Sequence, residues 1–197
     1  MDSRTTPPHE VRRRDRAKDD PWVRAFLARA ATGVLATVRD GQPYLNSNLF
    51  VYDPEAHVIY VHTAQAGKTR ANVEDHEKVS FTAFEMGRLL PADEALEFSV
   101  EYGGVVAFGT GRIVDDTAEE ERALQLILDK YAPHLRPGRD YRPITPQELK
   151  RTAVFRIEID RWSGKQKKVE DAFPGAFEYD PSWHGELPLE QEAPAQD

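Results

Sequence analysis

The chain has 197 residues, of which 40% are hydrophobic and 30% charged, so it is long enough for one domain with a core of its own. Its formal net charge of -8 argues against a general nucleic-acid surface, and the absence of cysteine excludes disulfides, thiolate nucleophiles and cysteine metal sites. No apolar run approaches the roughly 20 residues of a membrane helix, and the N-terminus lacks the apolar core of a secretory signal. We therefore expect a cytoplasmic protein with neither a nucleic-acid nor a membrane partner.

The two ends of the chain differ in composition from its middle. Residues 1–19 and 180–197 are polar and contain proline, whereas residues 20–179 carry the β-rich and helical patterns. Segments with little to bury remain solvated. The sequence therefore predicts a disordered N-terminal tail, one folded domain at residues 20–179 and a flexible C-terminal tail. We interpret the basic run at residues 12–16 as part of the solvated tail.

The folded part opens with a helix and an antiparallel meander. Asp20 and Pro21 provide an N-cap and a proline at the first helical position, and Gly33 ends the apolar stripe that follows. Three β-rich runs come next, at residues 33–40, 42–53 and 57–64. An Asp-Gly pair joins the first two runs and a proline-bearing turn joins the last two, which is typical of hairpins.

A second group of elements completes the pattern. A short helix at residues 68–75 is followed by strands at residues 78–85, 103–115 and 152–160, while Thr117 and Thr145 open two more helices with capping boxes. Six strands with few helices favour a small barrel over a doubly wound sheet, which requires a helix between most strands. We therefore predict a mainly β fold of six antiparallel strands with peripheral helices.

A Gly-Lys-Thr at residues 67–69 lies where a strand gives way to a helix. A phosphate loop of the NTPase type requires glycine five positions before Gly67, where this chain has His62, so nucleotide hydrolysis is not expected. The free N–H groups and the dipole of a helix start still favour an anion, and Lys68 and Thr69 add a cation and a hydroxyl. The alternative is a solvated helix start with no ligand.

Polar residues in two strands indicate a ligand site near this helix. Asn46, Ser47 and Asn48 interrupt an otherwise apolar strand, and buried amides require hydrogen-bond partners. His62 and Thr63 end the strand before the helix, and successive side chains on a strand project to opposite faces. A planar polar ligand would satisfy these groups. Amide pairing between strands or exposure to solvent would satisfy the asparagines without one.

In this order and spacing, the residues resemble the FMN-binding split-barrel proteins related to pyridoxamine 5'-phosphate oxidase. The resemblance covers residues 20–168 and rests on four stretches: GVLATVRDGQPYLNSNLFVYD, IYVHTAQAGKTRANVE, VEYGGVVAFGTGRIVDD and VFRIEIDRWSGKQKK. It implies a six-stranded antiparallel split β-barrel. It also implies a homodimer with FMN at the interface between subunits.

Carried over to the matching positions, the family's FMN site implies ten cofactor-binding residues. They lie in three strands and at the start of the short helix: Asn46, Ser47, Asn48, Val61, His62, Thr63, Lys68, Thr69, Trp162 and Lys165. The resemblance places Lys68 and Thr69 on the 5'-phosphate. It makes His62 the catalytic candidate, because a neutral imidazole can hydrogen-bond the flavin or a substrate.

The closing segment departs from the pyridoxamine phosphate oxidases themselves. Their Arg-x-His-Asp-Arg type segment, which grips the substrate, is replaced here by RWSGKQKK at residues 161–168. The pattern is closer to the branch of flavin-nucleotide-binding and nitroimidazole-resistance-type proteins. It implies an FMN-dependent oxidoreductase that acts on an unidentified small molecule, and the alternative is a non-catalytic protein that binds, senses or stores flavin or haem.

The histidines show no metal signature. His57, His62 and His76 have spacings that match no zinc site, so no metal is expected. Haem remains an alternative cofactor, because related split barrels bind it through a histidine.

Overall fold

The computed structural model describes residues 7–184, and the tail predictions for residues 1–6 and 185–197 lie outside this range. The described chain divides into two compact units. The barrel unit comprises residues 7–85 and 102–167, and the hairpin unit comprises residues 86–101 and 168–184.

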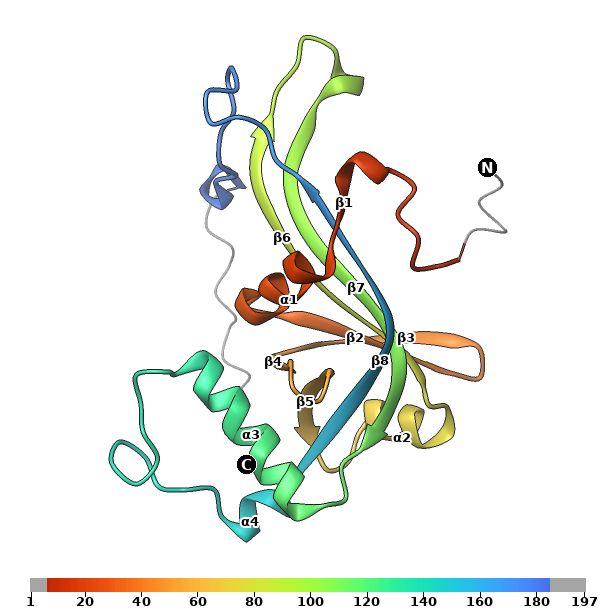
Figure 1. The fold of residues 1–197 in the computed structure, drawn as a ribbon, viewed down its shortest axis with the longest axis vertical. Helices are drawn as coiled ribbons and strands as arrows, with labels where there is room; N and C mark the ends of the chain where they lie inside the picture. Colours follow the sequence, from red (N-terminus) through yellow and green to blue (C-terminus); the bar gives the residue numbers. More distant parts are fainter. Residues whose placement is uncertain (1–6, 185–197) are drawn as a thin grey trace, which may run out of the picture. The chain divides into compact units, whose positions relative to one another are not determined.

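The barrel unit is built on an antiparallel sheet with the strand order β3-β2-β6-β7-β8-β5-β4 and with β1 paired to β8 (Figure 1). The strands are β1 (Ala17–Lys18), β2 (Gly33–Arg39), β3 (Gln42–Asn48), β4 (Phe50–Asp53), β5 (Val58–Ala64), β6 (Lys78–Leu90), β7 (Ser99–Ile113) and β8 (Thr152–Lys167). The predicted mainly β, antiparallel class is confirmed. The predicted count of six strands is wrong, because the sheet has eight.

The two additional strands have different origins. The run at residues 42–53 was predicted as one strand, but it divides at Leu49 because the chain changes neighbours there: β3 pairs with β2, and β4 pairs with β5. The hydroxyl of Tyr131 lies 3.1 Å from both the backbone nitrogen and the backbone oxygen of Phe50, just after this break. The other strand, β1, comes from the predicted tail.

Part of that predicted N-terminal tail has regular structure. A 3-10 turn at Arg14–Arg16 leads into β1, whose Ala17 and Lys18 pair with Lys165 and Gly164 of β8. Gly164 allows the close approach of α1, because a Cβ there would lie only 2.7 Å from Cγ2 of Val23. The strand pairing is long-range, so the local composition of residues 14–18 did not indicate it.

Four α-helices within residues 7–184 accompany the sheet: α1 (Asp20–Arg29), α2 (Lys68–Asp75), α3 (Thr117–Tyr131) and α4 (Pro146–Leu149). The bounds of α2 match the prediction, and α4 has the predicted capping box on Thr145. The caps of α1 and α3 lie one residue earlier than predicted, on Asp19 and Asp116, whose carboxylates accept from Trp22 N and Glu119 N. No helix among the described residues is long and apolar enough to cross a membrane.

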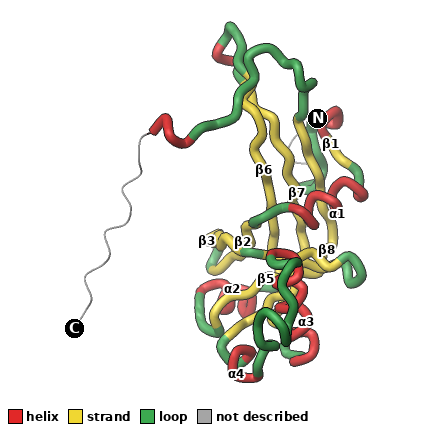
Figure 2. The backbone as a smooth tube through the Cα atoms, turned by 90° about the vertical axis from the view of Figure 1, so that its left-hand side faces the viewer, coloured by secondary structure: helices red, strands yellow, loops and turns green. Residues whose placement is uncertain are grey.

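The helices of the barrel unit pack against different strands. Helix α1 contacts β4 and β8, α2 contacts β2, and α3 contacts β4, β5 and β8. Figure 2 shows α2, α3 and α4 gathered around β5. The larger apolar cluster includes Ile59 and Val61 of β5, and a second cluster under α3 includes Val58 and Tyr60. The two faces of β5 are therefore buried by different neighbours.

The hairpin unit is held by an ion pair that also binds backbone groups. Arg88 donates to both carboxylate oxygens of Glu101 at 2.9 and 3.0 Å, and Glu101 accepts from Val169 N at 2.9 Å. Arg88 also donates to the carbonyl oxygens of Glu170 and Asp171. A carboxylate and a guanidinium with several partners each order the connection between residues 86–101 and residues 168–171.

Candidate functional site

The start of α2 and strand β3 meet at one corner of the barrel unit. Asn46 donates through Nδ2 to Oγ1 of Thr69 at 3.1 Å, and Nζ of Lys68 lies 5.7 Å from the centroid of the Tyr44 ring. Three residues predicted from two separate segments are therefore brought together. We call Tyr44, Asn46, Lys68 and Thr69 the α2 corner.

The register of β2 and β3 explains why Asn46 points toward α2. Asn46 is directly opposite the buried Leu35, and Tyr44 is opposite the buried Thr37, so these side chains share the core face of the sheet. On this face, Nδ2 of Asn72 donates to Oγ1 of Thr37 at 2.9 Å. This buried hydrogen bond joins α2 to β2 and sets where the first turn of the helix lies.

The first turn of α2 has no capping side chain. Its N-cap is Gly67, whose φ of 154° lies in the region that favours glycine, and no side chain accepts from the N–H groups that follow. In contrast, α1 and α3 are capped by Asp19 and Asp116. The uncapped N–H groups and the positive end of the helix dipole therefore remain available to an anion.

Lys68 is the cation that this corner leaves unpaired. The neighbouring Arg70 donates to Glu74 at 2.8 Å and to the side-chain oxygen of Gln65 at 2.5 Å. Lys68 is exposed and forms no ion pair with another residue of the range 7–184. An unpaired lysine beside an uncapped helix start can hold a phosphate group, because the charge and the N–H groups act together.

The hydroxyl of Thr69, which the sequence placed on a phosphate, is directed toward Asn46. Its side chain is only 4% exposed, and Oγ1 already accepts from Asn46. The hydroxyl therefore fixes the Asn46 amide, and the backbone N–H of Thr69 is the group that belongs to the uncapped helix start.

The asparagines of β3 are partly satisfied within the chain. Nδ2 of Asn48 donates to the carbonyl oxygen of Asn46 at 2.7 Å, and Nδ2 of Asn46 lies 3.4 Å from Oδ1 of Asn48. Ser47 is exposed and lies opposite Val34, on the outer face of the sheet. The structure therefore brings Asn46 and Asn48 to the α2 corner and turns Ser47 away from it.

The three predicted site residues at the end of β5, Val61, His62 and Thr63, lie on two different faces of the strand. Val61 is buried in the larger apolar cluster, and Thr63 follows on the same face, where its hydroxyl donates to the carbonyl oxygen of Ala64 at 2.9 Å. His62 extends the opposite face, which Tyr60 shares with α3. Thr63 therefore lies on the core side with the α2 corner, whereas His62 does not.

The imidazole of His62 is exposed, yet the surrounding protein lowers its pKa through desolvation. The charged form is disfavoured, so the ring is neutral at neutral pH and has a free nitrogen acceptor. No group of three or more metal-ligating side chains occurs within residues 7–184.

Trp162 and Lys165 lie three positions apart on β8 and point to opposite faces. Trp162 packs against the core, and its Nε1 donates to Asp20 of α1 at 2.7 Å. Lys165 lies on the outer face, with Nζ 5.4 Å from the centroid of the Tyr102 ring. Within one chain the structure brings neither residue to the α2 corner.

Sequence reasoning missed two residues that shape the corner. Tyr44 and Asn72 were not predicted, although Asn72 lies three residues after Thr69 and so on the same side of a helix. That spacing was the available signal for Asn72. The position of Tyr44 follows from the register between β2 and β3, which the sequence does not display.

The sequence matches the pyridoxamine 5'-phosphate oxidase family over residues 19–166. The chain belongs to this family, as the resemblance predicted. No curated protein sequence matches the chain significantly.

Solved structures with a similar fold include three flavin- or resistance-related proteins. The flavocytochrome Anf3 of Azotobacter vinelandii is 22% identical with a TM-score of 0.72, over 97% of this chain and 91% of its own. The FAD and heme binding protein of Mycobacterium smegmatis is 22% identical with a TM-score of 0.68, over 78% and 75%. A protein described as a candidate 5-nitroimidazole antibiotic resistance protein of Bacteroides thetaiotaomicron is 16% identical with a TM-score of 0.63, over 76% and 84%. These likenesses confirm the split-barrel fold.

Proposed function

We propose that the protein binds a flavin nucleotide, FMN in the first instance, and that the α2 corner holds the phosphate. The observation that carries this proposal is the uncapped start of α2 with the unpaired Lys68 beside it, joined to β3 through Asn46 and Thr69. A bound flavin would supply hydride or electron transfer, and the protein would bind, orient and tune it. Family membership and the names of the similar structures support a flavin as the ligand.

In this proposal, different residues of the α2 corner bind different parts of the flavin nucleotide. Lys68 and the first N–H groups of α2 hold the phosphate, while Asn46, fixed by Thr69, offers its amide to the rest of the ligand. Thr63 faces the same side, so it is the β5 residue that we assign to the ligand. FAD is the competing flavin, because proteins of this fold are named as FAD-binding.

Flavin titration of a Lys68→Ala variant tests the phosphate assignment. Loss of a charge-assisted hydrogen bond should weaken FMN binding about tenfold to a hundredfold, and riboflavin, which has no phosphate, should be unaffected. Arg70→Ala is the matched control, because it removes a neighbouring cation that Glu74 and Gln65 already engage. Equal FMN affinity in the parent and Lys68→Ala would contradict the assignment. Parallel titrations with FMN and FAD identify the preferred nucleotide.

We also propose a homodimer, supported by exposed apolar side chains in and just after β3. Leu45 of β3 is 65% exposed, and Leu49, at the break between β3 and β4, is 46% exposed. Exposed leucines in one short segment favour a protein-protein contact. Light scattering should give twice the mass of the 22.4 kDa chain, and Leu45→Lys should shift it toward the monomer. A monomeric parent at micromolar concentration would contradict the proposal.

We propose that the holoprotein is an oxidoreductase for a small molecule and is not a pyridoxamine phosphate oxidase. His62 is the proposed proton-transfer group, because it is exposed and neutral at neutral pH. It lies on the face of β5 opposite the α2 corner, so in this proposal it acts on the flavin held by the other subunit of the dimer. Anaerobic mixing with NADH or NADPH should bleach the flavin absorbance, and His62→Gln should slow later turnover with an acceptor. Absence of reduction by either nucleotide would favour a flavin-binding protein without catalysis.

Haem binding is the second candidate function. The observation in its favour is the exposed His62 with its lowered pKa, since neutral imidazole is the form that ligates iron. Two similar structures are named as a flavocytochrome and an FAD and heme binding protein. A Soret band in the parent that is lost in His62→Ala would support this function, and a flavin spectrum alone would argue against it.

A further inference from the structure

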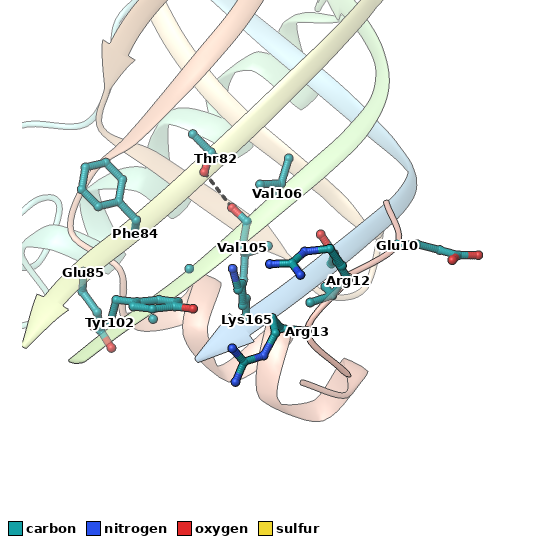
Figure 3. Close-up of a pocket in the computed structure, with 14 residues that line it drawn as sticks. Glu10, Arg12, Arg13, Thr82, Phe84, Glu85, Tyr102, Val105, Val106 and Lys165 are labelled. Carbon is teal, nitrogen blue, oxygen red and sulfur yellow. Dashed lines mark hydrogen bonds between the residues drawn. The ribbon is translucent and has the colours of Figure 1, made fainter. Parts of the chain in front are cut away.

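A cavity lies on the outer face of the barrel unit, on the opposite side of the sheet from the α2 corner. Its volume is about 480 Å³, within the range of small-molecule sites. The segment at residues 10–13 crosses one side of it, and residues of β6, β7 and β8 form the rest (Figure 3). We call it the outer pocket.

The floor of the outer pocket is bare backbone at Gly104. A Cβ on Gly104 would lie 3.4 Å from the carbonyl oxygen of Ala83 and 3.5 Å from Cβ of Phe84, which are ordinary contacts. The preceding Gly103 is different, because a Cβ there would lie 2.9 Å from Phe26. Packing therefore requires Gly103 and does not require Gly104. A strand glycine that packing does not need is typical of a place where a ligand approaches the backbone.

The pocket carries a surplus of positive charge on a chain with a net charge of -8. Two of its charged residues are already neutralised: Arg13 binds Asp15 at 2.8 and 2.6 Å, and Glu85 binds Arg29. Lys165 and Arg12 form no ion pair with another residue of the described chain. Figure 3 shows the Arg12 guanidinium directed toward the middle of the labelled residues.

The remaining acid of the lining is Glu10, and Figure 3 shows its carboxylate directed away from the other labelled residues. The charge that faces the cavity is therefore that of Arg12 and Lys165. Two cations without a protein counter-ion favour an anionic ligand.

Tyr102 adds a directed hydroxyl. Nη1 of Arg16 donates to the Tyr102 oxygen at 3.2 Å, and Lys165 is its other hydrogen-bond partner. Burial raises the pKa of Tyr102, and hydrogen bonds from Arg16 and Lys165 outweigh that effect and lower it. Because arginine and lysine are donors only, the Tyr102 hydrogen is left to point at an acceptor in the pocket.

Phe84 supplies an apolar wall. Phe84 is 72% exposed and lines the cavity together with Tyr102. Aromatic faces and a flat backbone floor favour a planar ring over a flexible chain.

From this geometry we propose that the outer pocket binds a small aromatic carboxylate, with its ring over Gly104 and Phe84 and its carboxylate between Arg12, Lys165 and the Tyr102 hydroxyl. Lys165 then serves this ligand and not the flavin. The binding stands on the pocket alone. That the ligand is the substrate of a flavin-dependent reaction rests on the proposed function.

Salicylate is the probe, because it is a planar aromatic carboxylate with its own fluorescence. It should bind the flavin-loaded protein at least about tenfold more tightly than salicylamide, which has the same ring and no charge. Lys165→Ala and Arg12→Ala should each weaken salicylate about tenfold, whereas Arg13→Ala, whose charge Asp15 already neutralises, should change it little. Equal binding in all four proteins would overturn the proposal.

Gly104→Val provides the steric test. The new Cβ meets only ordinary contacts, so the strand should fold, and the methyl groups should occupy the floor and abolish salicylate binding. Flavin affinity and oligomeric state should not change. Loss of flavin binding, or a change of oligomeric state, in Gly104→Val or Lys165→Ala would overturn the proposal, because the pocket would then hold the cofactor or a second subunit. A protein that binds salicylate as expected but takes up no flavin would contradict the proposed function alone.

Discussion

Helices α1 and α2 are both short and both lie against the sheet of the barrel unit. The polar groups at the ends of α1 have hydrogen-bond partners within the described chain, whereas those at the start of α2 do not. The carboxylate of Asp19 caps the start of α1, and Lys130 donates to the Leu27 carbonyl oxygen near its end at 3.2 Å. Helix α2 begins at Gly67 with no capping side chain, and Lys68 has no counter-ion within the described chain. The first helix is complete within the chain, and the second is completed by a ligand in our proposal.

The residues around α1 extend this difference. Asp20 and Arg24 of α1, with Tyr52, His57 and Trp162, form a set that we call the α1 cluster. Trp162 lies edge-on to His57 at 4.7 Å, and Arg24 donates to the Tyr52 hydroxyl at 2.5 Å, which also lies 3.0 Å from Nδ1 of His57. Polar groups that satisfy one another stabilise a fold and leave nothing to bind. The start of α2, whose N–H groups and lysine lack partners within the described chain, is therefore the better candidate for a binding site than the start of α1.

Replacing Trp162 should have the largest effect on stability. Trp162→Ala removes a large ring that packs against the core and a hydrogen bond to Asp20, so the free energy of unfolding should fall by about 3 kcal/mol. Trp162→Phe keeps most of the ring and should lose about 1 kcal/mol. Urea titrations measure both. If Trp162→Phe has the stability of the parent but binds FMN more than tenfold more weakly, Trp162 is a cofactor-binding residue, as the family resemblance implied.

Lys130, which donates to the Leu27 carbonyl oxygen near the end of α1, should make the free energy of unfolding depend on pH. Burial lowers the pKa of its ammonium to about 8, although Nζ also lies 3.6 Å from the centroid of the Phe50 ring, whose face attracts the charge. The pKa of a lysine in an unfolded chain is about 10.4. Between the folded and the unfolded pKa, the unfolded chain therefore holds one more proton than the folded chain. The free energy of unfolding should therefore rise as the pH increases from about 8 to about 10.4.

Denaturation at several pH values in this window measures that rise. Lys130→Met, of similar length and without charge, should lose this increment and be at least as stable as the parent at pH 7, since no buried ammonium remains. Lys150→Met, at an exposed lysine, is the matched control and should keep the parental pH dependence. The same rise in Lys130→Met and in the parent would show that another group titrates.

The sequence predicted most elements of the fold because their signals are local. Apolar periodicity and turn residues located the strands of the meander, and α2 was predicted with its observed bounds. Strand lengths were less predictable. β6 extends to Leu90, β7 starts at Ser99 and β8 continues to Lys167, because pairing between strands stabilises residues beyond those with a local strand pattern.

The residues of the candidate site also differ in how local their signals are. Lys68 and the position of the helix start were predicted from a local motif, and the structure brings Asn46 of β3 into contact with Thr69 of α2. The faces on which Trp162 and Lys165 lie were not predicted, because a side chain's face depends on strand register and not on residue type. The outer pocket was missed for the same reason, since it joins residues 10–13 to three strands that only the fold brings together.

The smallest expected effect on stability is at Thr69, where the two helices can be compared most directly. Thr69→Val keeps the buried shape and removes the oxygen that accepts from Asn46, so the free energy of unfolding should fall by about 1 kcal/mol. Asp19→Ala removes the cap of α1 and should lose a similar amount. Only Thr69→Val should also weaken FMN, because it releases the Asn46 amide from the orientation that the ligand uses. If both variants lose the same stability and neither changes FMN affinity, the start of α2 is a structural helix end like that of α1.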